Sequence, residues 1–306
     1  MRSKRIVAAI GAMATVVSGA VVGAAAGGGV AAAAPACPRV HVIAIPGTWE
    51  TSAKPKRKPS PGMLAGVTRG LPSDYRVDYV QYAATAFPWE GEVYGKSRRE
   101  AVDGARGLIQ ATAQRCAATK FAIVGYSQGA DAAGDVAAEI GTGLGVVPPH
   151  RVSAVGLLSD PSRSPQDVQV GPHVDGAGAA GPRPGGFGLV TPVTRTICAI
   201  GDLYCSTASS DFATRFAGFL AGVSEMNPAK LWSYQQQFGA IMADLMNGGG
   251  IGLLQSQFTD QANAKRAKQL QRFYNSNVHN DYASYHVSAG QTAPQWLHNY
   301  LLQAGH

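Results

Sequence analysis

Residues 121–129 form an apolar run that leads into a glycine-flanked serine: Phe121-Ala122-Ile123-Val124-Gly125-Tyr126-Ser127-Gln128-Gly129. The run up to Val124 predicts a buried strand, and the alanine-rich segment 130–140 predicts a helix. A G-x-S-x-G turn between a strand and a helix is typical of a nucleophile elbow, which holds the serine hydroxyl above the sheet in a strained backbone conformation. The glycines are needed because strand and helix pass too close there for a Cβ atom. Ser127 is therefore the candidate nucleophile, and a chance match in a glycine-rich chain is the alternative interpretation.

The segments on either side alternate between strand and helix patterns. Strands are predicted at residues 40–45, 75–82, 152–158 and 194–200, and helices just after Gly62 and at 96–116. A long loop rich in Gly and Pro is expected at 165–188. This alternation predicts an α/β fold, a mostly parallel, doubly wound sheet with helices on both faces.

Three polar residues follow the ends of predicted strands. They are Thr48, Ser127 and Asp202. Ligands of doubly wound sheets bind beyond the carboxyl ends of the strands. We therefore expect these three residues to lie close together.

A serine hydroxyl is a weak nucleophile until a base takes its proton, and that base needs an orienting carboxylate. In doubly wound hydrolases the chain order is Ser, then Asp or Glu, then His. Asp202 is the candidate carboxylate because it ends a strand after Ser127. Asp160 also ends a strand and is the competitor, although Pro161 after it indicates a turn.

Two histidines compete for the role of base. His279 and His286 both lie before the last predicted helix, residues 293–302, and their spacing alone does not choose between them. The remaining histidines precede Ser127 or Asp202, lie within that helix or stand at the chain end: His41, His150, His173, His298 and His306.

Residues 206–275 interrupt the alternation with helical patterns alone. Apolar residues from Phe212 to Val223 and from Leu231 to Leu245 recur at helical spacing, and a polar helix is predicted at 261–273. The segment is therefore interpreted as a helical insertion. Its apolar stripes are explained either by ordinary packing or by a cap that lines an acyl pocket.

The start of the chain predicts export. Arg2, Lys4 and Arg5 precede an apolar segment rich in small residues, and Ala34-Pro35-Ala36 resembles a cleavage site, so residues 1–36 are predicted to be a signal peptide. An uncleaved anchor is the alternative, since the apolar stretch approaches spanning length. Residues 37–306 are predicted to form a single domain.

The cysteine count agrees with an oxidising compartment. Four cysteines follow the leader, without C-x-x-C metal spacing, and they allow three pairings. Cys198 with Cys205 is a natural local pair, which leaves Cys37 with Cys116.

The charge balance argues against a nucleic-acid partner. The net charge of +7 includes three positive charges in the leader, which leaves 23 basic and 19 acidic residues, or +4. The one dense basic run is 54–58, where prolines predict an extended loop. It is interpreted either as a solvated loop or as a contact with anionic headgroups or an anionic envelope polymer.

At two motifs the chain resembles the cutinase family of serine esterases. They are Cys198-x-x-x-Gly201-Asp202-Leu203-x-Cys205 and Gly125-Tyr126-Ser127-Gln128-Gly129. The resemblance covers about residues 37–205 and 276–303, and it implies that Ser127 is the nucleophile and Asp202 the orienting carboxylate. The family's disulfide pairing matches the one inferred above.

Two further segments extend the resemblance. Pro46-Gly47-Thr48-Trp49-Glu50 resembles the family's loop after the first strand. That likeness implies an oxyanion hole made by Thr48 and the backbone N–H of Gln128. His279-Asn280-Asp281-Tyr282 resembles the family's H-x-x-Y, which favours His279 over His286 as base.

One departure concerns the substrate. Compact cutinases have the catalytic Asp and His close in sequence, whereas Asp202 and His279 are 77 positions apart with the helical insertion between them. Longer mycobacterial cutinase-like proteins also carry extra sequence and are associated with lipase, phospholipase A and acyl-thioesterase activities at the cell envelope. The departure argues against plant cutin as substrate.

The sequence thus predicts an exported serine ester hydrolase of α/β-hydrolase type that acts on long-chain acyl lipids and needs no metal or organic cofactor. Its expected partners are the ester substrate and a membrane or cell-envelope surface. Phospholipase A, acyl-thioesterase and acyltransferase activities use the same triad and stay open, as does the oligomeric state. The alternative of another class is a non-catalytic envelope-binding protein.

Overall fold

The computed structural model describes residues 36–54, 60–225 and 228–305. The described residues from Cys37 onward belong to one compact unit. The predicted signal peptide up to residue 35, most of the basic run 54–58 and His306 lie outside the described residues.

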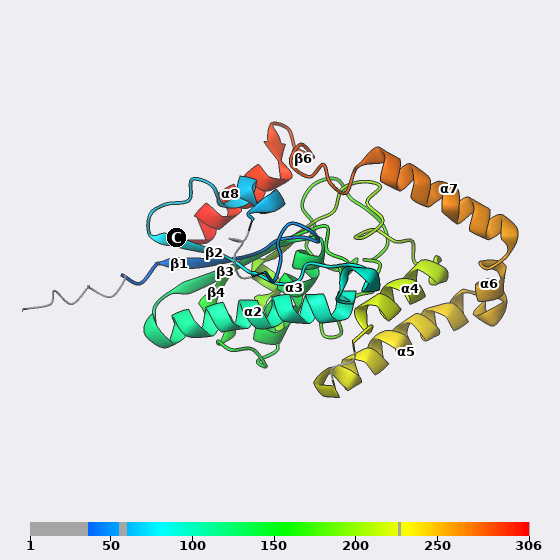
Figure 1. The fold of residues 1–306 in the computed structure, drawn as a ribbon, viewed down its shortest axis with the longest axis horizontal. Coiled ribbons are helices and arrows are strands. Elements are labelled where there is room, and N and C mark those ends of the chain that lie inside the picture. Colours follow the sequence, from blue (N-terminus) through cyan, green and yellow to red (C-terminus); the bar gives the residue numbers. More distant parts are fainter. Residues whose placement is uncertain (1–35, 55–59, 226–227, 306) are drawn as a thin grey trace, which may run out of the picture. The chain divides into compact units, whose positions relative to one another are not determined.

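The core of the unit is a five-stranded parallel sheet in the order β2-β1-β3-β4-β5 (Figure 1). The strands are β1 Val40–Ile45, β2 Tyr75–Tyr79, β3 Lys120–Tyr126, β4 Val152–Leu158 and β5 Thr194–Ile197. β3 pairs with β1 and β4, which places Ser127 beyond the middle strand. The predicted parallel sheet is confirmed.

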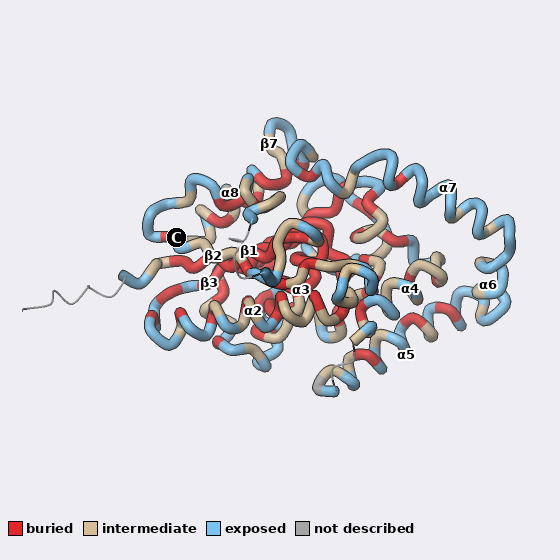
Figure 2. The backbone as a smooth tube through the Cα atoms, in the orientation of Figure 1, coloured by how far each residue is buried: buried red, intermediate tan, exposed pale blue. Residues whose placement is uncertain are grey.

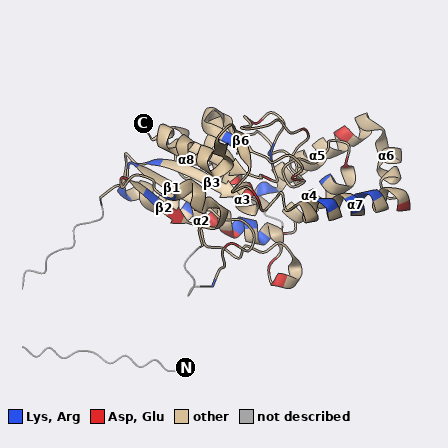
Figure 3. Cartoon of the chain, turned by 90° about the horizontal axis from the view of Figure 1, so that it is seen from above, with Lys and Arg blue, Asp and Glu red and all other residues tan. Residues whose placement is uncertain are grey.

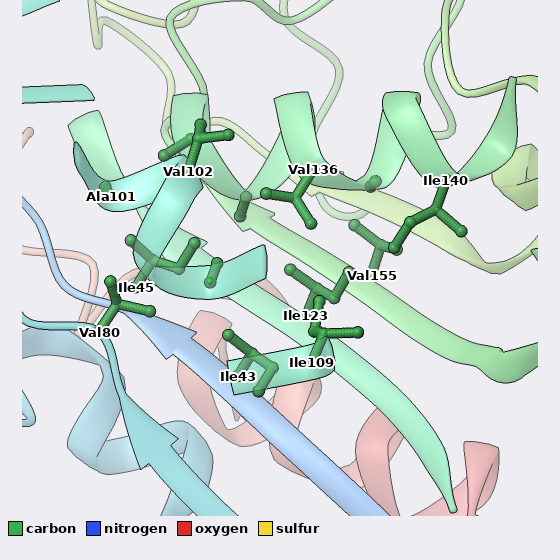
Figure 4. Close-up of a cluster of buried hydrophobic side chains, with 14 of the residues drawn as sticks. Ile43, Ile45, Val80, Ala101, Val102, Ile109, Ile123, Val136, Ile140 and Val155 are labelled. Carbon is green, nitrogen blue, oxygen red and sulfur yellow. The ribbon is translucent and has the colours of Figure 1, made fainter. Parts of the chain in front are cut away.

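Helices cover both faces of the sheet. One face carries α2 Tyr94–Arg115 and α3 Gln128–Gly141, and the other carries α1 Ala65–Thr68 and α8 Ala293–Ala304. Successive strand residues point to opposite faces, so Ile43 packs under α2 and α3 while Val42 packs under α8. Figure 4 shows the first of these clusters, in which Ile123 and Val155 of the sheet meet Val136 of α3. The arrangement is an α/β-hydrolase fold, as predicted.

Short elements complete the domain. Short 3-10 helices occur at Gly62–Leu64, Pro88–Glu90, Pro149–Arg151, Gly188–Val193 and Pro228–Lys230. A two-stranded antiparallel hairpin, β6 His286–Ser288 and β7 Gln291–Thr292, precedes α8.

Two strands are shorter than predicted. β2 ends at Tyr79 rather than residue 82, and β5 ends at Ile197 rather than residue 200. In the second case the chain turns into the loop closed by the Cys198–Cys205 disulfide. There the backbone N–H of Ala199 donates to the Tyr282 hydroxyl instead of a neighbouring strand. The apolar run therefore continues beyond the sheet.

The segment between Asp202 and His279 is helical. It contains α4 Phe212–Gly222, α5 Leu231–Gly248, α6 Gly250–Ser256 and α7 Asp260–Ser276. Phe212 of α4 packs against Ile241 and Leu245 of α5, so part of the apolar stripes is ordinary packing. α7 differs, because Phe273 is its one buried residue (Figure 2). Among the described helices, none has the length and apolar character needed to cross a membrane.

A buried ion cluster ties the long loop after β4 to α3. The guanidinium of Arg183 lies 2.6 Å from Asp160, 3.1 Å from Asp131 and 3.2 Å from Asp135. A Cβ at Gly134 would meet the Arg183 guanidinium carbon at 2.3 Å, so this glycine makes room for the cluster. Lys230, at the start of α5, joins Asp135 at 3.0 Å and thereby anchors the insertion.

We predict that Arg183→Ala lowers the free energy of unfolding by about 3–5 kcal/mol, because it leaves the buried carboxylate of Asp160 without its cation. Urea denaturation measures the change. The exposed Arg69, substituted by Ala, is the matched control and should stay within about 0.5 kcal/mol. A loss no larger than that of the control would contradict the role of the cluster.

Candidate active site

Ser127 sits in a strained turn between β3 and α3. Its φ of 54° lies in the left-handed region that non-glycine residues rarely adopt. A Cβ at Gly125 would lie 2.2 Å from the Gly129 carbonyl oxygen, and one at Gly129 would lie 2.0 Å from that of Ile45. Both glycines are therefore required by close backbone contacts, as the sequence indicated.

A chain of hydrogen bonds connects three side chains beyond the strand ends. Ser127 Oγ lies 2.9 Å from His279 Nε2, and His279 Nδ1 lies 3.0 Å from Asp202 Oδ2. Because the ionised Asp202 accepts a hydrogen bond from Nδ1–H, the neutral imidazole keeps Nε2 free to accept the proton of Ser127. Ser127 and Asp202 are buried, and the His279 side chain is 16% exposed.

The Asp202 carboxylate accepts four hydrogen bonds, one at Oδ1 from the backbone N–H of Tyr204 at 3.0 Å and three at Oδ2. His279 Nδ1, the Ser159 hydroxyl at 2.5 Å and the Tyr282 hydroxyl at 2.8 Å all donate to Oδ2. Burial disfavours the ionised form, but these hydrogen bonds outweigh burial and lower the pKa of Asp202. The carboxylate therefore stays charged at neutral pH.

Two aromatic rings fix the imidazole of His279. Tyr126 stacks on it with ring centroids 5.4 Å apart, and Tyr204 approaches from 4.5 Å. The Tyr126 hydroxyl also donates to the His279 carbonyl oxygen at 2.6 Å. Asn277 follows the last residue of α7, and its left-handed φ of 54° turns the chain towards His279.

The competing residues lie elsewhere. Asp160 is buried in the ion cluster with Arg183. His286 is exposed at the start of β6, and His298 contacts the Val67 carbonyl oxygen from within α8. His41 pairs with Asp78 in the sheet. The structure therefore brings Asp202 and His279, rather than Asp160 and His286, to Ser127.

The loop after β1 lies on another side of the site. Thr48 is half-buried there, and the Glu50 carboxylate holds the loop by accepting from the backbone N–H groups of Gly47 and Met63 at 2.8 and 2.7 Å. Burial raises the pKa of Glu50. Gln128 opens α3, where the first amides of a helix have no acceptor within the helix. Its side-chain amide donates to the Thr85 carbonyl oxygen at 2.9 Å.

Sequence reasoning missed Ser159 and Glu50. Ser159 follows β4 with a φ of 54°, and its N–H donates to the Ile197 carbonyl oxygen, which fixes the residue against β5. Its position at the end of a strand was the signal in the sequence, and the neighbouring Asp160 is the residue there that was considered as a candidate carboxylate. Glu50 belongs to the loop motif Pro46-Gly47-Thr48-Trp49-Glu50, but only the structure shows that its carboxylate holds this loop.

Both inferred disulfides are present, Cys37–Cys116 and Cys198–Cys205. The second closes the loop that carries Asp202. Among the described residues, no group of three His, Cys, Asp or Glu side chains gathers as metal ligands do.

A strained serine after a parallel strand, bonded through a histidine to a buried aspartate, is the arrangement of serine hydrolases with the α/β-hydrolase fold. A sequence model described as Cutinase matches residues 36–225, more than half of the chain. The chain therefore belongs to the cutinase family. The matched segment contains Ser127 and Asp202 and ends before His279.

Individual relatives give further comparisons. The Carboxylesterase Culp6 homolog of Corynebacterium glutamicum is 36% identical over 205 residues, which are 55% of this chain. The chain spans 65% of the length of this curated relative. The catalytic core of acetyl xylan esterase from Trichoderma reesei is similar in structure, with 19% identity over 66% of this chain and 100% of that one, at a TM-score of 0.45. A mycobacteriophage lysin B has 18% identity over 70% of this chain and 92% of its own, at a TM-score of 0.44.

We predict that Ser159→Ala lowers kcat/KM for ester hydrolysis by about tenfold or more, the effect of losing a hydrogen bond to a charged group. The acidic limb of the pH profile of kcat/KM should move to higher pH. The reason is that the Ser159 hydroxyl is one of the donors that lower the pKa of Asp202, so that pKa rises when the hydroxyl is removed.

Ser159→Gly is the matched control for backbone strain, because glycine adopts the left-handed conformation freely. The two variants should share the shifted profile while differing in stability. If each keeps the wild-type pH profile, the hydroxyl does not tune the His279–Asp202 pair.

Proposed function

We propose that the protein is a serine hydrolase of carboxylic esters, with Ser127 as nucleophile, His279 as general base and acid, and Asp202 as the orienting carboxylate. The observation that carries this proposal is the unbroken hydrogen-bond chain from Ser127 Oγ through the imidazole to Asp202 Oδ2. Membership of the cutinase family and a carboxylesterase among the relatives support the same reaction class.

The reaction begins when Ser127 Oγ attacks the acyl carbonyl carbon while His279 Nε2 takes the hydroxyl proton. The resulting imidazolium gives that proton to the leaving alkoxide, so an alcohol departs and an acyl-Ser127 ester remains. Water then repeats the attack through His279, releasing the acid and restoring Ser127. Asp202 stays ionised throughout and stabilises the imidazolium.

We assign the stabilisation of the oxyanion that forms at the acyl carbonyl oxygen to the backbone N–H of Gln128 and to Thr48. Donors aimed at this position act on charge that develops only in the transition state, and each commonly contributes about 3–4 kcal/mol. The two backbone bonds that Glu50 accepts support the assignment, because they fix the loop that carries Thr48.

For the substrate we propose long-chain acyl lipids at an anionic surface. The insertion exposes large apolar side chains: Leu220, Leu231, Trp232, Phe238, Met246, Ile251, Phe258, Leu270 and Tyr274. α7 adds the exposed basic residues Lys265, Lys268 and Arg272, and Figure 3 shows the basic character of this helix. Apolar side chains beside basic ones favour the interface of an anionic membrane.

We further propose that the protein acts outside the cytoplasm. The two disulfides support this, since such bonds persist in oxidising compartments. A signal peptide at residues 1–36 and an envelope location are part of the same proposal. Phospholipase A, acyl-thioesterase and acyltransferase reactions would use the same three side chains and differ in the acyl donor or acceptor.

We predict that Ser127→Ala abolishes hydrolysis of p-nitrophenyl butyrate and labelling by a fluorophosphonate probe, with an unchanged circular dichroism spectrum. Thr191→Ala, an exposed hydroxyl at a distant turn, is the control and should keep both activities. Full activity of Ser127→Ala would remove the proposed mechanism. Labelling absent from the wild-type protein would favour a non-catalytic binding protein instead.

We also predict that the protein sediments with phosphatidylglycerol vesicles more than with phosphatidylcholine vesicles. Lys265→Ser/Lys268→Ser should weaken that binding by about 2 kcal/mol, about 1 kcal/mol for each basic residue near the surface. Arg69→Ser/Arg76→Ser, which removes two basic residues outside the insertion, is the control. Equal binding to both kinds of vesicle would contradict the proposed anionic surface.

A further inference from the structure

A cavity of about 100 Å³ lies between α7 and the loop that follows Asp202. Its walls are mainly apolar and aromatic: Leu203, Tyr204, Ala208, Leu270, Phe273 and Tyr274. Polar residues also belong to the lining, namely Thr207, Asp211, Thr214, Arg266 and Gln269, but most of the wall surface is apolar and holds water weakly. The cavity suits an apolar ligand.

One end of the cavity adjoins the catalytic histidine. Tyr204 and Phe273 line the cavity, and the same two rings lie 4.5 and 6.4 Å from the His279 ring by their centroids. The two rings also pack on each other at 5.4 Å, edge to face. Cavity and imidazole are therefore separated by the thickness of one aromatic layer.

The other end of the cavity is polar. Arg266 lies seven residues before Phe273 on α7, about 10 Å along the helix axis. Arg266 and Asp211 both line the cavity and approach each other to 3.6 Å. Between the aromatic layer of Tyr204 and Phe273 and this ion pair, the cavity thus offers about 10 Å of mainly apolar wall along α7.

The helix α7, which forms one wall of the cavity, buries few of its side chains. Phe273 is its one buried residue, Ala262 and Arg266 are half-buried, and the other residues are exposed. Helices with so little buried surface open at low free-energy cost. α7 can therefore move away from the loop that follows Asp202 and admit an alkyl chain longer than the present cavity volume allows.

From these observations we propose that the cavity binds an unbranched alkyl chain of the ester substrate. This proposal rests on the proposed ester hydrolysis, because the bound chain is taken to be part of an ester substrate. Binding of the alkyl chain itself requires no turnover. The chain can belong to the acyl group or to the leaving alcohol, since both parts of an ester meet at Ser127 and the alcohol receives its proton from His279. The apolar wall and its polar end set the preferred chain length.

Binding is tested on the Ser127→Ala protein by calorimetric titration with octanol. We expect saturable binding that weakens by about tenfold or more when Leu270→Trp is added, because the larger side chain fills the middle of the cavity. Gln271→Trp, which adds the same ring on the exposed side of α7, is the matched control and should leave octanol affinity unchanged. Equal affinity in all three proteins, or no binding to Ser127→Ala, overturns the proposal.

Ala208→Phe fills the cavity from the opposite wall and keeps the test valid if Leu270→Trp fails to fold. It should weaken octanol binding in the same way. Loss of binding with Ala208→Phe supports the cavity, and retention of full affinity in that variant counts against it.

Turnover measurements then decide whether the bound alkyl chain belongs to the acyl group or to the alcohol of the ester. With Ser127 restored, Leu270→Trp should lower the octanoate-to-acetate ratio of kcat/KM for p-nitrophenyl esters if the cavity holds the acyl group. It should instead lower the octyl-to-ethyl ratio for acetate esters if the cavity holds the alcohol. A shift of either ratio supports the proposal, and unchanged ratios in both series overturn it. Absence of any ester turnover in the wild-type protein would refute the proposed function and leave the binding result to decide on the cavity.

Discussion

The buried carboxylate of Asp202 is the constraint around which the site is built. A charge in that position is tolerated because His279, Ser159 and Tyr282 all donate to one of its oxygens. These donors come from a turn after β4 and from the segment after α7, so a single carboxylate draws together parts of the chain that are far apart in sequence. The same bonds orient the imidazole and leave its other nitrogen for Ser127.

Close backbone contact supplies the second constraint. The elbow exists because β3 and α3 approach to distances that exclude any side chain at Gly125 or Gly129. The strained φ of Ser127 is stabilised by the parallel sheet beneath it, where Ser127 N–H donates to the Leu158 carbonyl oxygen. Ser159 repeats this geometry one strand further on, so both hydroxyls stand on the same sheet edge.

The insertion links surface and site. Lys230 pairs with Asp135 of the nucleophile helix, and α7 leads directly into the turn that carries His279. Phe273 is the point where α7 contacts both the imidazole and Tyr204. The same residue of α7 therefore lines the cavity and packs near the His279 ring.

From the four cysteines, the sequence by itself favoured the two disulfide pairs. It also predicted the parallel sheet and the elbow, and it favoured Asp202 over Asp160. These follow from local periodicity, from glycines demanded by backbone contact and from strand ends that share one sheet edge. Spacing alone left His279 and His286 open, and the resemblance of His279-Asn280-Asp281-Tyr282 to the family's H-x-x-Y favoured His279. Only the tertiary structure places the His279 imidazole beside Ser127, because the path of that loop depends on contacts from Tyr126 and Tyr204 that no spacing encodes. The Ser159 hydroxyl, the Arg183 cluster and the cavity under α7 also emerged from packing between distant segments, where local pattern carries no signal.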